Sequence, residues 1–144
     1  MFSKACEYGI RAVLFIAQES IKDRRVSLKE ITRQIDSPDA FTAKILQKLA
    51  RAGVVQSIKG PSGGFEISKK DLQRLKLSSI VNAIDGDSIY KGCGLGLRAC
   101  NANKPCPVHH EFAKVRDELK RMLETTSVFE LATQIGSGLT FLKR

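Results

Sequence analysis

The side chains that could bind a metal or take part in redox chemistry gather between Cys93 and His110 of this 144-residue chain. This stretch holds three of the four cysteines and both histidines, in the order Cys93, Cys100, Cys106 and His109. Thiols and imidazole gathered in a glycine-containing loop are typical of a metal site or a redox device. The gaps of six, five and two residues are wider than those of a compact zinc knuckle, so the spacing favours a larger guest such as an iron–sulfur cluster.

The same residues leave other chemistry open. Three cysteines and one histidine are also a complete ligand set for zinc. Without a metal, Cys93 and Cys100 could act as a thiol switch, or the three thiols could be free and form an adventitious disulfide in air. Cys6 differs from them, because it lies in an apolar helical pattern and is expected to be a small core residue.

The composition fits one basic domain. The chain has room for a single core, and no apolar run is long enough to span a membrane. The net charge is +9, and residues 1–70 carry 13 Lys and Arg against 7 Asp and Glu. This surplus suits a polyanion such as nucleic acid, although many basic proteins bind none. The N-terminus lacks a secretory signal, so we expect a cytoplasmic protein with no membrane partner.

Three helices are predicted in the first third of the chain. Residues 3–18 carry a broad apolar stripe, and a capping box at Ser27 precedes a short helix over residues 28–34. Ser37 suits the N-cap and Pro38 the first position of a third helix. Two short helices joined by a tight turn are typical of a helix-turn-helix.

A β-hairpin is predicted directly after these helices. Residues 54–59 and 65–68 resemble two strands, and the sequence GPSGG lies between them. A hairpin at this place is the wing of a winged helix, and its tip with Lys59 suits contact with a phosphate backbone or a minor groove. The predicted fold class is therefore mainly α with a small β-wing.

The second half is predicted to be helical on both sides of the cysteine loop. A short helix spans residues 78–84, a long helix runs from Pro107 to about Glu124, and a capping box at Ser127 starts a last helix. The long helix has a narrow apolar seam at Phe112, Val115, Leu119 and Met122. Such a seam suits a second copy of the chain, or packing on the winged helix of the same chain.

These predictions divide the chain into three parts. They are a winged helix-turn-helix DNA-binding domain (1–86), a cysteine-rich cluster-binding loop (87–107), and a long C-terminal dimerisation helix with a tail (108–144).

Taken together, the motifs resemble the family of winged-helix iron–sulfur transcription regulators of the IscR and NsrR (Rrf) type. The most specific are the start SKACEYGIRA, the run LQKLARAGVVQSIKGPSGGF from Leu46, and the three-cysteine loop between a short and a long helix. The resemblance covers nearly the whole chain. It implies a homodimer with crossing long helices, which binds a palindromic promoter site with an affinity that follows the state of a cluster.

The resemblance also implies the cluster ligands. Cys93, Cys100 and Cys106 would supply thiolates. His109 matches the fourth ligand of the IscR-like pattern and implies [2Fe–2S], whereas Glu7 lies where NsrR-like members supply a carboxylate from the other subunit, which implies [4Fe–4S]. We favour His109 and [2Fe–2S], because imidazole suits the more oxidised iron and is close in sequence. Such clusters are easily lost in air.

The predicted DNA contacts come from the third helix and the wing. Ser37 and Pro38 start the recognition helix, Ala40, Phe41, Thr42 and Lys44 face the groove, Lys48 faces the backbone, and Lys59, Pro61 and Ser62 form the wing contact.

The predicted function is a homodimeric, sequence-specific DNA-binding transcriptional regulator controlled by an iron–sulfur cluster that senses iron–sulfur status, redox or nitric oxide. An enzyme is not expected, because no orienting group or oxyanion hole accompanies Cys106. The alternatives are a metal-free or zinc-bound thiol-redox regulator, and a metal-binding adaptor without DNA binding.

Overall fold

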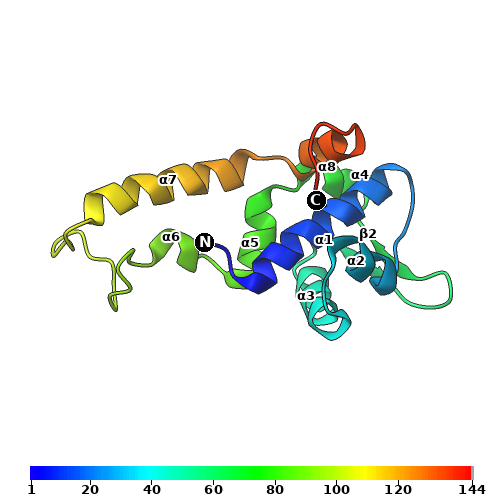
Figure 1. Cartoon of the computed structure of the whole chain (residues 1–144), viewed down its shortest axis with the longest axis horizontal. Coiled ribbons are helices and arrows are strands. Elements are labelled where there is room, and N and C mark those ends of the chain that lie inside the picture. The colour runs from blue at the N-terminus through cyan, green and yellow to red at the C-terminus, as the bar shows by residue number, and fades with distance from the viewer. Residues whose placement is uncertain (144) are drawn as a thin grey trace.

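The computed structural model describes residues 1–143, which form eight helices and one two-stranded antiparallel sheet (Figure 1). This architecture confirms the predicted fold class. Most elements pack around α1, whereas α6 and α7 extend together to one side and carry the cysteine loop at their far end (Figure 1).

The central helix is α1 (Lys4–Ile21), because most of its apolar stripe is buried. It contacts α2 (Leu28–Ile35), α3 (Asp39–Arg51), α5 (Leu77–Asp85) and α8 (Val128–Gly136). The core has contributions from both halves of the chain, and its fully buried side chains include Val13, Ile16, Ile31, Leu46, Leu49, Ile80, Leu123 and Val128. Cys6 is also fully buried, as its position in the apolar pattern predicts.

Two helices begin at the serine N-caps of the predicted capping boxes. The hydroxyl of Ser27 accepts from the amide of Glu30 at 3.2 Å, and the hydroxyl of Ser127 accepts from the amide of Glu130 at 3.3 Å. Each bond satisfies an amide that has no partner within the first turn of its helix. The start of each helix is thus set locally, by a serine and the amide three residues after it.

The start of α3 corrects a prediction. Pro38, rather than Ser37, occupies the N-cap position, and the helix begins at Asp39. The Ser37 hydroxyl instead lies 2.6 Å from the hydroxyl of Thr42. Because Pro38 keeps an extended ψ of 135° and α2 continues to Ile35, the three-residue turn between the two helices lies one position later than predicted.

The predicted hairpin is formed by β1 (Gln56–Ile58) and β2 (Gly64–Glu66). It is also joined to the segment before α2: the amide of Val26 donates to the carbonyl of Phe65 at 3.1 Å, and the Phe65 amide donates back at 2.7 Å. Gly64 is required at this junction, because its φ is +143° and a Cβ there would lie 2.4 Å from the Val26 carbonyl oxygen. The wing therefore packs closely against the helices.

The second half contains two short helices that we did not predict, α4 (Lys69–Arg74) and α6 (Ser88–Lys91). The long helix α7 (His109–Thr125) begins two residues later than predicted. Its C-terminal end joins the core where the amide of Leu77 donates to the carbonyl of Thr126 at 3.1 Å. Over residues 1–143, no helix has the length and hydrophobicity needed to cross a membrane.

Candidate DNA-binding surface and cysteine site

The outer face of α3 carries four of the residues predicted to contact DNA. Ala40, Phe41, Lys44 and Lys48 are exposed on it. The Phe41 ring meets the ring of Tyr8 edge-on, with 5.7 Å between centroids, and remains 38% exposed. Lys44 and Lys48 lie one helical turn apart, so their ammonium groups extend from the same face. This face offers both apolar and cationic contacts.

Thr42 does not belong to this face, and this corrects the prediction that it faces the groove. Its side chain is fully buried. The hydroxyl donates to the carbonyl of Pro38 at 2.8 Å and lies 2.6 Å from the Ser37 hydroxyl. A threonine that bonds back to the preceding turn satisfies its polar atom locally and can pack inward. Thr42 therefore stabilises the helix-turn-helix turn.

The wing exposes Lys59, Pro61 and Ser62 at its tip, as the predicted contacts require. Arg25, which we did not predict, fixes this tip. Its guanidinium donates to the Ser62 carbonyl at 2.9 Å and pairs with the Glu66 carboxylate at 3.2 Å. An arginine can hold two acceptors at once because its donors form a rigid fork.

A groove of about 540 Å³ lies between the recognition helix and the wing. Its lining combines apolar and polar side chains, namely Leu28, Ala43, Gln47, Ala50, Arg51, Ser57, Lys59 and Phe65. Gln47, Arg51 and Ser57 are polar members that we did not predict. The helical spacing could have identified two of them, because Gln47 and Arg51 each follow a predicted contact, Lys44 or Lys48, by three residues.

The predicted cluster ligands come together at the N-terminal end of α7, away from the core. Cys93, Cys100, Cys106 and His109 all line one cavity of about 10 Å³. The Cys100 sulfur lies 3.3 Å from Nδ1 of His109. The space that the four side chains share is about the size of a water molecule. In the described part of the chain, no group of three or more His, Cys, Asp or Glu side chains is arranged to hold a metal ion.

The thiols at this site and in the core differ in their electrostatics. Backbone hydrogen bonds from Leu95 and Leu97 lower the pKa of the Cys93 thiol, with a smaller contribution from Cys106. Burial raises the pKa of Cys6 to about 12, and the nearby Asp85 carboxylate adds to this shift. Cys93 is therefore the more reactive thiol of the two.

The other candidate ligands do not line the cysteine cavity of their own chain. Glu7 is paired with Lys4 at 3.1 Å near the start of α1. His110 packs edge-on against His109, with 5.2 Å between ring centroids. The role of Glu7 as a ligand from the other subunit stays a prediction.

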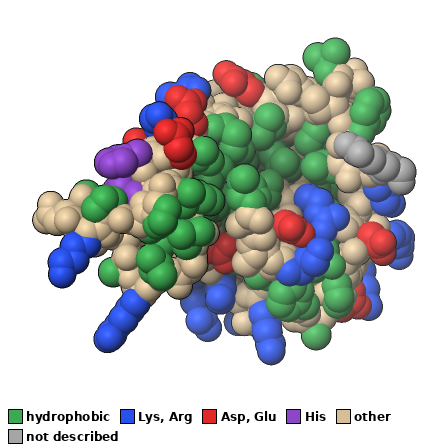
Figure 2. Space-filling model, turned by 60° about the vertical axis from the view of Figure 1, so that its left-hand side comes forward, with side chains coloured by type: hydrophobic (Ala, Val, Ile, Leu, Met, Phe, Trp, Pro, Cys, Tyr) green, Lys and Arg blue, Asp and Glu red, His purple; other side chains and the backbone are tan. Residues whose placement is uncertain are grey.

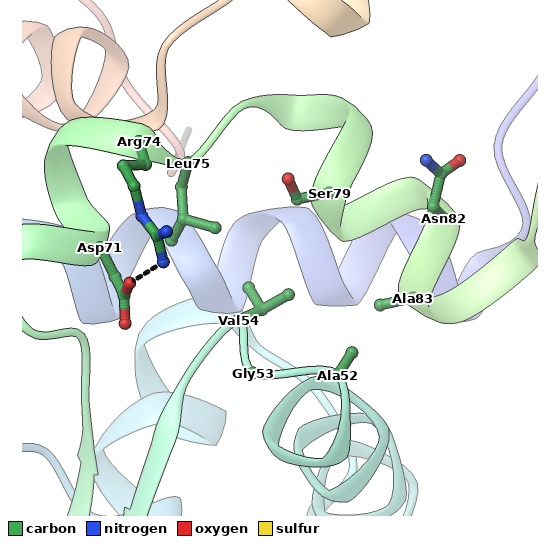
Figure 3. Close-up of a pocket in the computed structure, with 9 residues that line it drawn as sticks. All are labelled: Ala52, Gly53, Val54, Asp71, Arg74, Leu75, Ser79, Asn82 and Ala83. Atoms are coloured by element: carbon green, nitrogen blue, oxygen red, sulfur yellow. Dashed lines mark hydrogen bonds and ion pairs between the residues drawn. The ribbon is translucent and has the colours of Figure 1, made fainter.

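A further cavity of about 500 Å³ lies between the end of α3 and helices α4 and α5 (Figure 3). Arg74 pairs with Asp71 at 2.5 Å beside it (Figure 3). These are the charged side chains among the nine residues that line the cavity, and each neutralises the other. The cavity lacks the groups that would select a charged ligand.

The exposed side of α7 keeps the predicted apolar seam. Phe112, Val115 and Met122 are 39%, 56% and 42% exposed, although Leu119 packs partly against the core. Hydrophobic side chains gather on one face beside the histidines (Figure 2). Large apolar groups gathered on a surface are typical of an interaction site.

Residues 2–134 match the Rrf2 family, which is described as iron-dependent transcriptional regulators. The chain belongs to the Rrf2 family. One relative, an HTH-type transcriptional regulator of Aquifex aeolicus (strain VF5), is 29% identical over 133 residues, which are 91% of this chain and 90% of the relative. This Rrf2-family chain is a DNA-binding transcriptional regulator and not an enzyme, as predicted.

Two solved structures have the same fold as this Rrf2-family chain. CymR, the global cysteine regulator of B. subtilis, has a TM-score of 0.74 at 20% identity, over 92% of this chain and 96% of CymR. IscR of T. potens has a TM-score of 0.75 at 18% identity, over 97% of this chain and 91% of IscR. The likeness confirms the winged-helix architecture.

Proposed function

We propose that this Rrf2-family regulator is a homodimer that binds a palindromic DNA site with an affinity controlled by an iron–sulfur cluster. The proposal rests on one observation. Three thiols and one imidazole gather around one cavity at the N-terminal end of α7, and they come from Cys93, Cys100, Cys106 and His109. The relatives named IscR support a cluster of this kind. We also propose a cytoplasmic location, because the regulator must meet its DNA.

The donor set fits a cluster by its chemistry. Thiolates are the usual ligands of iron–sulfur clusters, and an imidazole can replace a thiolate on one iron. The cavity of about 10 Å³ is too small for the cluster, so the loop has to open for loading. When bound, the cluster would supply a centre that responds to redox conditions, nitric oxide or cluster supply. We favour [2Fe–2S] with His109, and retain [4Fe–4S] with Glu7 of a second copy as the alternative.

The DNA surface of each subunit combines α3 with the wing. The helix presents Ala40, Phe41 and Lys44 towards a groove, and the phosphate backbone is within reach of Lys48 and of the wing tip at Lys59. Pro61 and Ser62 complete the tip. A homodimer would place two such surfaces symmetrically, which matches a palindromic site.

Anaerobic purification tests the cluster. We expect a brown protein with iron and sulfide, whose DNA affinity changes when the cluster is removed. Cys93→Ser should remove the colour, whereas Cys6→Ser should retain it, because Cys6 is buried in the core. A colourless wild-type protein with stoichiometric zinc, or with no metal, would exclude the iron–sulfur proposal.

A thiol-redox regulator is the second candidate. The lowered pKa of Cys93 favours its thiolate, and Cys100 lines the same cavity. Oxidation of two such thiols to a disulfide would need no metal. Metal-free protein in which an oxidant forms a Cys93–Cys100 disulfide and changes DNA affinity would support this candidate.

A further inference from the structure

The cysteine loop is tied to α7 at several points by residues outside the ligand set. Arg116, in the middle of α7, donates to the carbonyl of Gly92 at 2.5 Å and to the sulfur of Cys100 at 3.3 Å. One turn earlier, the ring of Phe112 lies over Gly94, where a Cβ would be 2.5 Å from the ring. The guanidinium therefore bridges the start of the loop and the middle cysteine.

We propose that Arg116 is a positioning residue that holds the cysteine loop on α7 and donates to the sulfur of Cys100. This inference rests on the proposed function, and adds a residue outside its ligand set. The rigid fork of an arginine can hold a carbonyl oxygen and a sulfur together, and a cation donates strongly to a thiolate. Residues that donate to metal ligands tune the site and the orientation of the ligands.

The surroundings of Arg116 differ from those of an ordinary surface arginine. Its Nε is buried and has no hydrogen-bond partner among residues 1–143. The buried hydroxyl of Tyr90 is likewise without a partner, and both residues line one cavity of about 410 Å³ between α6 and α7. By contrast, Arg121 on the same helix is exposed and pairs with Glu118 at 2.7 Å. Arg116 is thus oriented by the loop.

The position of Arg116 connects the loop to the seam of α7. Phe112 contacts Gly94 and is also 39% exposed in the predicted seam. Arg116 and Phe112 are four residues apart and so act on the loop from the same side of the helix. Opening of the loop would release Phe112 from Gly94 and change the surface offered to a second copy.

Limited proteolysis of the full-length apo-protein tests the loop contact without a cluster. Trypsin can cut after Arg98, which is exposed in the middle of the loop. We expect Arg116→Met to raise the cleavage rate at Arg98 about tenfold, because local opening becomes easier. Arg121→Met is the matched control, since it removes the same charge from the same helix, and it should cleave like wild type. Equal rates in the two variants would overturn the proposal.

A second variant separates the contacts of the Arg116 side chain from its charge. Arg116→Lys keeps the charge but cannot hold the Gly92 carbonyl and the Cys100 sulfur at the same time. We therefore expect this variant to lose most of the protection against trypsin. Wild-type protection in Arg116→Lys would overturn the positioning role. Thermal unfolding of each variant shows that the fold itself is retained.

Cluster retention gives the holo-protein readout. With a chelator present, Arg116→Met should release iron about tenfold faster than wild type and Arg121→Met. Equal release from all three proteins would overturn the donor role at Cys100. A wild-type protein that binds no iron and sulfide would instead refute the proposed cluster, while the trypsin experiment would still decide whether Arg116 holds the loop.

Discussion

At the scale of single residues, Thr42 and Lys44 of the recognition helix have different roles. Thr42 is buried and bonded to the turn before α3, whereas Lys44 is exposed. We expect Thr42→Val to lower the free energy of unfolding by about 1–2 kcal/mol, because the Pro38 carbonyl and the Ser37 hydroxyl lose a partner. Lys44→Ala should leave stability within about 0.5 kcal/mol of wild type and weaken DNA binding.

Urea unfolding and fluorescence anisotropy with labelled DNA measure the two effects separately. The two variants serve as controls for each other, since they lie two positions apart on one helix. A Thr42→Val protein of wild-type stability with altered sequence preference would show that Thr42 reaches the bases after all.

The buried thiol allows a prediction about reactivity. With a pKa of about 12, Cys6 is ionised to only about one part in 10⁴ at pH 8, and Cys93 has the opposite shift. We expect iodoacetamide to label Cys93 in native metal-free protein at pH 8 while Cys6 stays unlabelled. Mass spectrometry identifies the labelled cysteines, and labelling of all four in denaturant is the control. Equal labelling of Cys6 and Cys93 in the native state would mean that α1 opens readily.

At the scale of elements, the wing depends on how closely β2 approaches the segment before α2. Gly64→Ala should lower the free energy of unfolding by about 2–3 kcal/mol, because the new methyl group would meet the Val26 carbonyl at a positive φ. Gly60→Ala is the matched control: its φ is also positive, at +102°, but a Cβ there meets nothing within 4 Å. We expect the control to cost about 1 kcal/mol.

Chemical denaturation compares the two glycine variants. A Gly60→Ala variant as unstable as Gly64→Ala would show that backbone strain, and not contact with Val26, limits substitution in the wing.

At the scale of the whole molecule, the seam of α7 predicts assembly. Val115 is 56% exposed. Val115→Glu should convert the proposed dimer into a monomer while the winged helix stays folded, because a carboxylate buried between two apolar seams lacks a partner. Lys114→Met makes the same change in net charge at an exposed neighbour and should stay dimeric. Sedimentation velocity measures the state, and a dimeric Val115→Glu protein would place the interface elsewhere.

The charge of the molecule predicts a strong salt dependence of DNA binding. The net charge is +9, with most of the surplus in the half that carries the winged helix. If each subunit of a dimer neutralises several phosphates, affinity should fall by on the order of 10³-fold from low to physiological salt, because condensed counterions are released on binding. Anisotropy titrations at several salt concentrations measure the slope. A flat response would contradict phosphate contact by the lysines.

Local signals in the sequence determined most helices and the hairpin. The hydroxyls of Ser27 and Ser127 cap helices through amides three residues away, and the turn over residues 59–63 separates two strands that pair as predicted. Interactions over a few residues depend on residue type and spacing, which the sequence displays directly. The sequence also predicted that Cys93, Cys100, Cys106 and His109 form one group.

Only the tertiary structure decided which long-range contacts form. Arg25 meets Ser62 and Glu66 across 37 and 41 positions, and Arg116 meets Gly92 across 24. A charged residue has many partners available in the sequence, and packing selects among them. The burial of Thr42 has a different origin, because Thr42 lies three and four positions before the buried Ile45 and Leu46 and so shares their face of α3. Its bond to the Pro38 carbonyl satisfies the hydroxyl there.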